Sequence, residues 1–136
     1  MPTEESQPEA ALTELLRDLL YPSESDEPLE SVAYPIALDS PLTPSQLRDL
    51  LGIKPDVYVE EIPEAEFWKP VVVDQDWYED EEKQRTKRFR QVRHLLRKLV
   101  KNRQVFRVGE TEVDVYLLGR KKDGHWAGLK TRVVET

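Results

Sequence analysis

Apolar residues recur at helical spacing in three parts of the chain. The first run has leucines at positions 12, 15, 16, 19 and 20, which predicts a helix over residues 7–20. In the second run, Thr43 and Gln46 have the spacing of a capping box, and Gly52 marks the end of the helix. The third run predicts the longest helix, over residues 79–102, whose acidic first turn and basic later turns suit the helix dipole.

Alternation of apolar and polar residues predicts strands elsewhere. Residues 31–38 alternate in this way, and Pro35 favours an edge position because it cannot donate a hydrogen bond to a neighbouring strand. Three further strands are predicted over residues 104–109, 112–118 and 126–134. The Asp123-Gly124 pair is typical of a tight hairpin turn and lies between the last two of them.

The chain between these elements is less regular. The acidic segment 22–28 has a proline at each end and is predicted to be a surface loop. A short strand is expected within residues 55–62 and a helical turn within residues 63–69, whereas Val71-Val72-Val73 is too short to classify. Helices and strands followed by a long helix and an antiparallel meander predict an α+β fold, with helices packed against a mostly antiparallel sheet.

Charge is divided unevenly along the sequence. The net charge is -7, but residues 1–82 hold 22 acidic and 4 basic residues, a net of -18. Residues 83–136 hold 16 basic and 5 acidic residues, a net of +11. Such a division favours either two faces of opposite sign or a seam of paired charges, and a functional interpretation has to account for both.

The length and the apolar content set expectations for organisation and location. A chain of 136 residues fits one domain, expected to span residues 1–136 with residues 1–6 flexible. The sequence does not open with a basic and then apolar leader, and no apolar run approaches the roughly 18 residues of a membrane helix. Because the lack of cysteine also suits a reducing compartment, we expect a cytoplasmic protein without a membrane partner.

Few residue patterns in the chain favour catalysis. The absence of cysteine excludes a disulfide scaffold, a thiolate zinc site and a cysteine nucleophile. His94 and His125 are the only histidines, and two isolated histidines make a poor metal site without a third ligand. The serines lack the glycine pattern of a nucleophile elbow. We therefore expect that the protein is not an enzyme and carries no cofactor of its own.

Several short segments of the chain, in a fixed order, carry a family resemblance. They are Ser23-Glu24-Ser25, Asp76-Trp77-Tyr78, Arg107-Val108-Gly109, the run Thr111-Glu112-Val113-Asp114-Val115-Tyr116, Ala127-Gly128-Leu129 and Val133-Val134-Glu135-Thr136. Together, in this order and spacing, they resemble the cyanobacterial nuclease A inhibitor family. The resemblance covers most of the chain and is densest from Gln104 onwards, whereas the segment before Ser23 and the region 62–74 diverge.

The resemblance implies a fold and a function. The fold would be an α-β-α sandwich similar to that of the pathogenesis-related class 1 proteins. The function would be inhibition of a sugar-non-specific DNA and RNA endonuclease of the ββα-metal type, whose active site holds a catalytic Mg²⁺. The inhibitor would bind that nuclease rather than nucleic acid, and it would be a monomer when free.

The resemblance also implies roles for four residues. The hydroxyl of Thr136 would coordinate the Mg²⁺ of the nuclease, and Glu24 would stand in for the scissile phosphate. Asp76 and Trp77 would make a second contact. These residue types suit the task, because a hard divalent cation and basic side chains prefer oxygen ligands, and a carboxylate presents charge and oxygen without a cleavable bond.

Each of these residues also has a purely structural interpretation. Glu24 could be a solvated acid of a polar loop, and Thr136 a frayed chain end. Asp76 could cap the long helix, with Glu79 as its partner in a capping box. Trp77 could belong to the core or staple the start of that helix.

The basic helix leaves two other functions open. Ten lysines and arginines are concentrated in residues 83–103: Lys83, Arg85, Lys87, Arg88, Arg90, Arg93, Arg97, Lys98, Lys101 and Arg103. They could form a nucleic-acid-binding surface, or a solvated face partly paired with acids from the first half of the chain. The acidic net charge and the absence of interleaved aromatic residues favour the solvated face. A third alternative is an interaction domain that keeps the fold but has lost the nuclease partner.

Overall fold

The fold consists of helices packed against an antiparallel sheet, as the hydrophobic pattern predicts. The computed structural model describes residues 6–135, with side chains from residue 9 onwards. The helices are α1 (Ser6–Leu16), α2 (Pro44–Leu51), α3 (Glu64–Val72) and α4 (Asp80–Leu99). The main sheet contains β3 (Glu30–Tyr34), β4 (Val59–Ile62), β5 (Lys101–Val108), β6 (Glu112–Arg120) and β7 (Trp126–Val134), in the order β3-β7-β6-β5-β4. The strands β1 (Leu20–Tyr21) and β2 (Glu27–Pro28) pair separately, and the predicted α+β class is confirmed.

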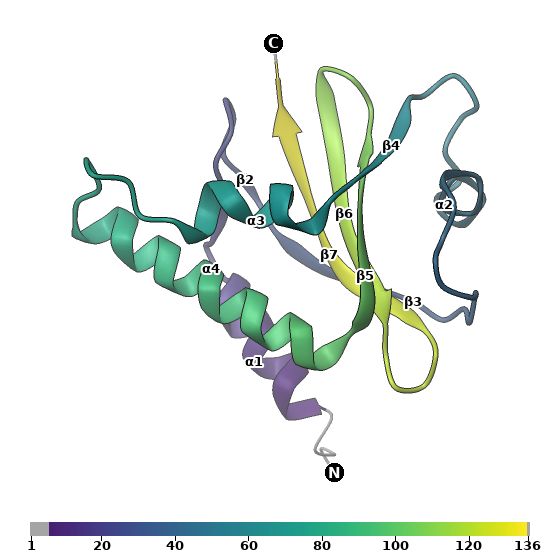
Figure 1. Cartoon of the computed structure of the whole chain (residues 1–136), viewed down its shortest axis with the longest axis horizontal. Helices are drawn as coiled ribbons and strands as arrows, with labels where there is room; N and C mark the ends of the chain where they lie inside the picture. Colours follow the sequence, from purple (N-terminus) through teal and green to yellow (C-terminus); the bar gives the residue numbers. More distant parts are fainter. Residues whose placement is uncertain (1–5, 136) are drawn as a thin grey trace.

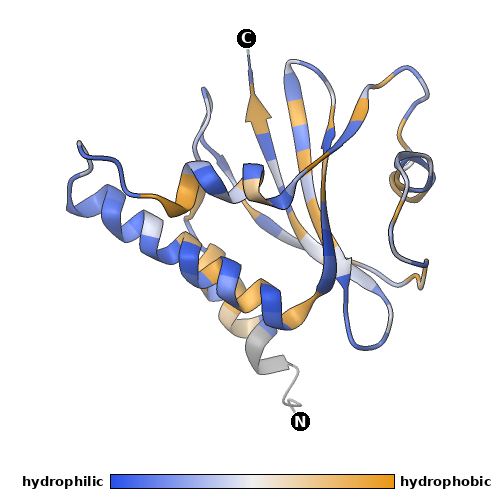
Figure 2. Cartoon of the chain, viewed as in Figure 1, coloured by the Kyte–Doolittle hydropathy of each residue, from blue (hydrophilic) through white to orange (hydrophobic). Residues whose placement is uncertain are grey.

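Both faces of the main sheet are covered. In Figure 1, α1, α3 and α4 lie on one side of the sheet and α2 lies on the other, which is the layering of an α-β-α sandwich. Successive strand residues therefore enter different cores: Val105 packs in the cluster under α1, α3 and α4, and Phe106 packs in the cluster under α2. Figure 2 shows apolar residues along the central strands, with alternating apolar and polar bands over part of β6.

The predicted helices are present, but two of them are shorter than expected. The helix expected over residues 7–20 ends at Leu16, because Asp18 takes a left-handed conformation with φ of 58° and the chain turns there. Leu19 is buried although it has left the helix, so the leucine spacing continued past the helix end. The Thr43 capping box and the left-handed Gly52 are both confirmed for α2. The long helix runs over Asp80–Leu99 rather than residues 79–102.

The segments of ambiguous pattern resolve into short elements. The strand expected over residues 31–38 ends at Tyr34, where the amide of Ile36 donates to the carbonyl of Tyr34 at 2.7 Å, and β3 is an edge strand as Pro35 indicates. The helical turn expected within residues 63–69 is the two-turn helix α3, which takes in Val71 and Val72.

The acidic segment 22–28 is a loop over residues 22–26, as expected, but its last two residues belong to β2 of a short β-hairpin. β1 and β2 pair Leu20 with Pro28 and Tyr21 with Glu27. Residues 22–26 form the tip, and we call them the acidic tip.

Two predictions concern residues that the structure does not describe. Residues 1–6 are predicted to be flexible, and of these only Ser6 is described. The role predicted for Thr136 concerns a residue outside the described range.

Candidate functional site

The acidic tip is a folded turn. The amide of Ser23 donates to Oδ1 of Asp26 at 3.1 Å, and the amide of Ser25 donates to Oγ of Ser23 at 3.3 Å. Asp26 closes the turn in a left-handed conformation with φ of 43°. Aspartate tolerates this conformation better than most residues because its side chain bonds to nearby backbone. Glu24 is exposed at the end of this turn and is thus presented by an ordered backbone.

The acidic tip is attached to the end of β7. The amide of Val134 donates to Oγ of Ser23 at 3.3 Å, and Oγ1 of Thr131 donates to the carbonyl of Pro28 at 3.0 Å. These two bonds join segments more than 100 positions apart in the sequence. They place Glu24 beside the strand that leads to Thr136, so the structure brings together the neighbourhoods of two residues that the sequence predicts to act jointly.

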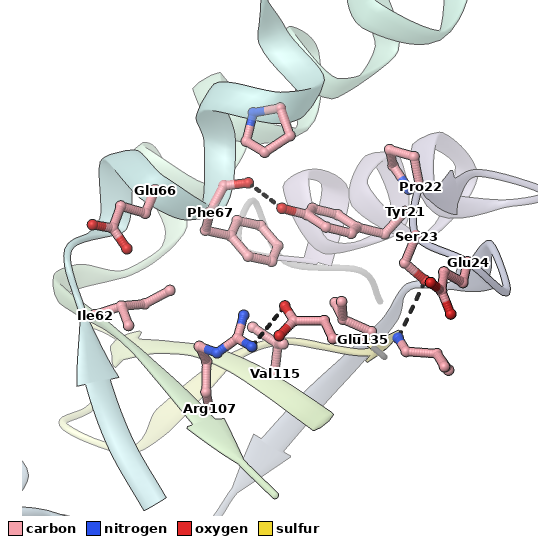
Figure 3. Close-up of a pocket in the computed structure, with 13 residues that line it drawn as sticks. Tyr21, Pro22, Ser23, Glu24, Ile62, Glu66, Phe67, Arg107, Val115 and Glu135 are labelled. Atoms are coloured by element: carbon pink, nitrogen blue, oxygen red, sulfur yellow. Dashed lines mark hydrogen bonds and ion pairs between the residues drawn. The ribbon is translucent and has the colours of Figure 1, made fainter. Parts of the chain in front are cut away.

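A cavity of about 470 Å³ lies between the acidic tip and α3. Figure 3 shows Glu24 and Glu66 on opposite sides of it, with the aromatic rings of Tyr21 and Phe67 between them. Arg107 and Glu135 line the same cavity, and their side chains form an ion pair of 2.7 Å. The cavity therefore combines an apolar wall with several carboxylates and one guanidinium.

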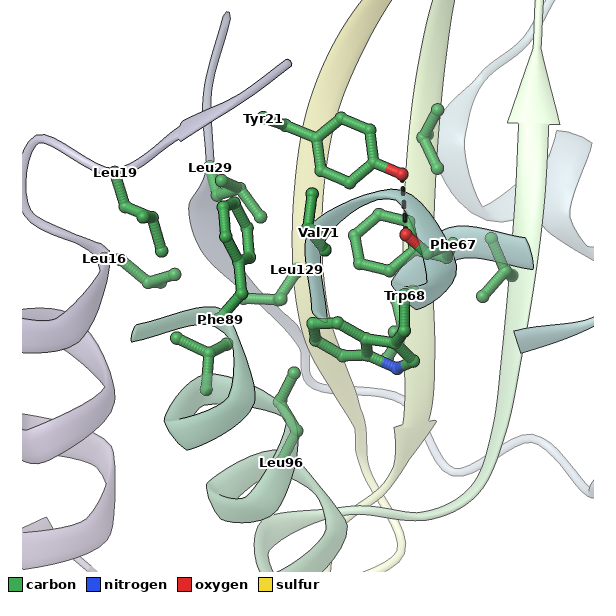
Figure 4. Close-up of a cluster of buried hydrophobic side chains, with 14 of the residues drawn as sticks. Leu16, Leu19, Tyr21, Leu29, Phe67, Trp68, Val71, Phe89, Leu96 and Leu129 are labelled. Carbon is green, nitrogen blue, oxygen red and sulfur yellow. Dashed lines mark hydrogen bonds between the residues drawn. The ribbon is translucent and has the colours of Figure 1, made fainter. Parts of the chain in front are cut away.

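Tyr21 holds the acidic tip to the helical layer. Its hydroxyl donates to the carbonyl of Phe67 at 2.6 Å, and its ring stacks on that of Phe67 with centroids 5.0 Å apart (Figure 4). The ring of Phe89 meets Tyr21 edge-on at 6.1 Å. Burial raises the pKa of Tyr21 to about 12, although Arg107 acts in the opposite direction.

This raised pKa predicts a loss of stability at high pH. The unfolded tyrosine ionises near pH 10 and the folded one near pH 12, so between these values only the unfolded chain releases the proton. Rising pH then favours unfolding by about 2 kcal/mol. Chemical denaturation between pH 9 and pH 12 should show a shallower decline for Tyr21→Phe than for the wild type. Equal declines would mean that Tyr21 does not titrate differently in the folded protein.

A second cavity, of about 420 Å³, lies on the other side of the acidic tip. It is lined by Asp26 of the tip and by Glu81 and Arg85 of α4. The first turns of α4 are therefore neighbours of the tip. The acidic tip occupies the middle position, between the end of β7 and the start of α4.

The structural interpretation of Asp76 is wrong. The N-cap of α4 is Glu79, and the capping box pairs it with Glu82. The amide of Glu79 donates to Oε2 of Glu82 at 2.8 Å. Asp76 lies three residues before this cap and is exposed. The sequence contained two acidic spacings suitable for a cap, and the helix uses the later one.

Trp77 does not belong to the core either. Its side chain is 69% exposed, the highest value among the exposed large hydrophobic residues. Its ring stands edge-on against Tyr78 with centroids 4.7 Å apart, and Tyr78 is buried under the guanidinium of Arg85 at 5.8 Å. The side chain of Tyr78 is therefore buried, whereas the neighbouring side chain of Trp77 remains exposed. An exposed tryptophan with a supported ring is a common feature of protein interfaces.

Several bases of the long helix have intramolecular partners. Arg88 donates to the carbonyls of Leu15 and Arg17, at the end of α1. Arg90 donates to the carbonyl of Val72 at 2.8 Å, which satisfies the end of α3. After the helix, Arg103 pairs with Glu64 at 3.0 Å. These three bases thus connect neighbouring elements of the helical layer and β5. Arg88 and Arg90 do so through backbone carbonyls, and Arg103 does so through an acidic side chain, as the sequence suggested.

The described residues contain no group of three or more histidine, aspartate or glutamate side chains that could hold a metal ion. What the acidic tip and the end of β7 offer is a small number of oxygen atoms, at Ser23, Glu24 and Glu135. Such a set can complete the coordination of a hard cation bound elsewhere, or accept hydrogen bonds from basic side chains, but it is too sparse to bind a cation alone.

Comparison with protein families identifies the chain. A family model described as nuclease A inhibitor-like protein matches residues 7–136. The chain belongs to this family. The comparison with curated proteins finds no match. Membership of the nuclease A inhibitor-like family implies the role of a nuclease inhibitor, with a nuclease as the partner. None of the described helices is long and apolar enough to cross a membrane.

The site of this nuclease A inhibitor-like protein contains residues that the sequence did not single out. Arg107 and Glu135 lay within the segments that carry the resemblance, but nothing in the sequence paired them. No local pattern marks Glu66 or Tyr21, because their relevance depends on how the β1–β2 hairpin folds against α3. The available signal for the hairpin is segment 22–28, which has a proline at each end and five acidic or serine residues between them.

Proposed function

We propose that this protein inhibits a sugar-non-specific, metal-dependent DNA and RNA endonuclease of the ββα-metal type by occupying its active site. One observation supports this above the others: the acidic tip that presents Glu24 and the strand that leads to Thr136 are hydrogen-bonded to each other and border one cavity. Residues at two distant positions in the sequence can therefore enter one concave site together.

In this proposal Glu24 replaces the scissile phosphate of the nucleic acid. A nuclease site attracts a polyanion with basic side chains and a divalent cation, and a carboxylate satisfies the same partners. The turn of the acidic tip is already formed by the bonds of Ser23 and Ser25. Less conformational entropy is then lost when the tip enters the site than a flexible loop would lose.

Thr136 is proposed to bring its hydroxyl to the Mg²⁺ of the nuclease. When bound, that ion polarises the phosphoryl oxygen and activates water in the nuclease reaction. The contribution of this chain is to hold an oxygen at that position. The amide of Glu135 donates to the carbonyl of Thr111 at 2.8 Å, so the main chain is fixed up to the residue before Thr136.

Asp76 and Trp77 are proposed to make the second contact, beyond the active site itself. Both are exposed, and they lie in the segment that leads into α4, whose first turn shares a cavity with Asp26 of the acidic tip. The acids around them, which include the first turn of α4, give this segment a negative potential. Such a potential steers the inhibitor towards a basic cleft and raises the association rate more than the affinity.

The experiment that tests this function is inhibition by Thr136→Val. The substitution keeps the shape of the side chain and removes the hydroxyl, and loss of one bond to a charged group costs about 1.5 kcal/mol, or roughly tenfold in the inhibition constant. The measurement is the inhibition constant against a purified sugar-non-specific nuclease, with Thr136→Ser as the matched control that keeps the hydroxyl. Failure of the wild-type protein to inhibit would refute the proposed function. Equal constants for the wild type and Thr136→Val would refute the role of this hydroxyl.

A further inference from the structure

A chain of polar contacts crosses the main sheet and ends at Glu135. The hydroxyl of Tyr58 lies 3.1 Å from Oε2 of Glu60, and Oε1 of Glu60 lies 3.5 Å from Nε of Arg107. The Nη2 atom of Arg107 lies 2.7 Å from Oε1 of Glu135. Arg107 is the central member, because it alone contacts carboxylates on both sides.

The sheet register explains how Arg107 reaches both carboxylates. Glu60 of β4 is directly opposite Arg107 of β5, so these two side chains share one face of the sheet. On the other side, Arg107 is opposite Val115 of β6, whose short side chain leaves room above the strand. The guanidinium extends over that strand to Glu135, beyond the end of β7, as Figure 3 shows.

Arg107 is well suited to hold a carboxylate in a fixed position. Its side chain is only 22% exposed and lines the wall of the cavity, whereas the side chain of Glu135 is 49% exposed. A planar guanidinium loses less freedom per hydrogen bond than a lysine would. Glu135 is thus held by two groups: the guanidinium of Arg107 pairs with its side chain, and the carbonyl of Thr111 accepts a hydrogen bond from its backbone amide.

We propose that Arg107 is a positioning residue for the end of the chain: by fixing Glu135, it restrains the residue to which Thr136 is attached. This inference rests on the proposed function for its effect on inhibition, but its structural part concerns the free protein alone. Arg107 itself lies behind Glu135, against the cavity wall, and acts through Glu135 rather than on the nuclease.

Two measurements test this role, with Arg132→Gln as the matched control. Arg132 also pairs with carboxylates across strands of the same sheet, at 3.2 Å from Asp114 and 4.0 Å from Glu112. Its strand neighbour Val133 packs under the helical layer, so Arg132 lies on the opposite face from Arg107. The control therefore removes a similar ion pair without touching Glu135.

The first measurement uses the free protein. Backbone ¹⁵N relaxation of the Thr136 amide should show larger fast motion in Arg107→Gln than in the wild type or in Arg132→Gln. The melting temperatures of the three proteins should agree closely, because partly exposed ion pairs contribute little to stability. Unchanged relaxation at residue 136 would overturn the proposal whether or not the protein inhibits a nuclease.

The second measurement is a double-mutant cycle of inhibition constants. Arg107→Gln and Glu135→Gln should each raise the constant by about fivefold, and the double variant should be no worse than the weaker inhibitor of the two. Additive losses, of about 25-fold in the double variant, would mean that Arg107 acts independently of Glu135 and would overturn the proposal. A wild-type protein without inhibition refutes the proposed function, and the relaxation measurement then decides the role of Arg107 by itself.

Discussion

Glu24→Gln is expected to weaken inhibition by about 3–4 kcal/mol, on the order of several hundredfold, because it removes the charge that replaces the phosphate. The substitution leaves a basic side chain or a cation of the nuclease without its charged partner, and that group is desolvated in the complex. Stability should change little, since Glu24 is exposed at the acidic tip and glutamine keeps the length and nearly the shape of its side chain. The measurements are the inhibition constant and the thermal unfolding of the variant.

Glu61→Gln supplies the matched control for this prediction. Glu61 is also an exposed glutamate, but it lies on the edge strand β4 and shares the α2 side of the sheet with its register partner Phe106, away from the cavity that Glu24 lines. The same loss of one negative charge should there alter only the long-range attraction, within a few tenths of a kcal/mol. If both variants lost inhibition equally, net charge rather than phosphate replacement would be the explanation. A large fall in melting temperature for Glu24→Gln would instead show that the residue is structural.

Trp77→Ala is the second change with a large expected effect, about 3 kcal/mol or on the order of a hundredfold in affinity. The ring is 69% exposed in the free protein and would be desolvated against the nuclease. Truncation therefore removes contact area from the complex while the folded monomer loses only an edge contact with Tyr78. Surface plasmon resonance or calorimetry on the complex would measure the loss.

A buried tryptophan provides the contrast that this prediction needs. Trp68 is 2% exposed, and its Nε1 donates to Oε2 of Glu64 at 2.9 Å. Trp68→Phe should therefore lower the free energy of unfolding, through a cavity and an unsatisfied partner, and leave the affinity of the folded protein almost unchanged. A different result for Trp77→Ala would contradict its place in the interface. In that result the variant is destabilised as much as Trp68→Phe, and its folded molecules bind the nuclease with wild-type affinity.

The sequence predicts the elements of this fold where local patterns decide them. The cap of α2 is determined by Thr43, Gln46 and Gly52, which lie within ten residues of one another, and all three act as expected. The last strand, predicted over residues 126–134, agrees with β7 in both bounds. Such features depend on neighbours in the chain, so no knowledge of the tertiary structure is required.

Predictions failed where tertiary packing overrides a local pattern. Leu19 and Leu20 continued the helical spacing, but the chain turns at Asp18 so that Leu19 enters the core and Leu20 begins the hairpin. Similarly, Asp76 has a suitable capping partner in the sequence, but Tyr78 is buried between Asp76 and the helix, and the N-cap of α4 is Glu79. In both cases a buried side chain outweighs a capping or periodicity preference of about 1 kcal/mol.

The candidate site could be predicted only in part for a related reason. The resemblance singled out Glu24, Asp76, Trp77 and Thr136 as a set, and the structure joins the acidic tip to the strand that leads to Thr136. The contacts that hold this region together join positions far apart in the sequence, such as Ser23 with Val134 and Arg107 with Glu135. They depend on strand register and tertiary packing, which local sequence patterns do not reveal. The likeness of residue types therefore proposes a candidate surface, and the structure adds the residues that hold the acidic tip and the end of β7 together.

The most direct test of active-site occupation is competition with the substrate of the nuclease. Initial rates of DNA cleavage would be measured at several inhibitor concentrations and at DNA concentrations below and above KM. If the acidic tip and Thr136 occupy the active site, inhibition is competitive: the apparent KM rises with inhibitor and kcat is unchanged. A fall in kcat at constant KM would place the inhibitor outside the active site and contradict the proposed mode of inhibition.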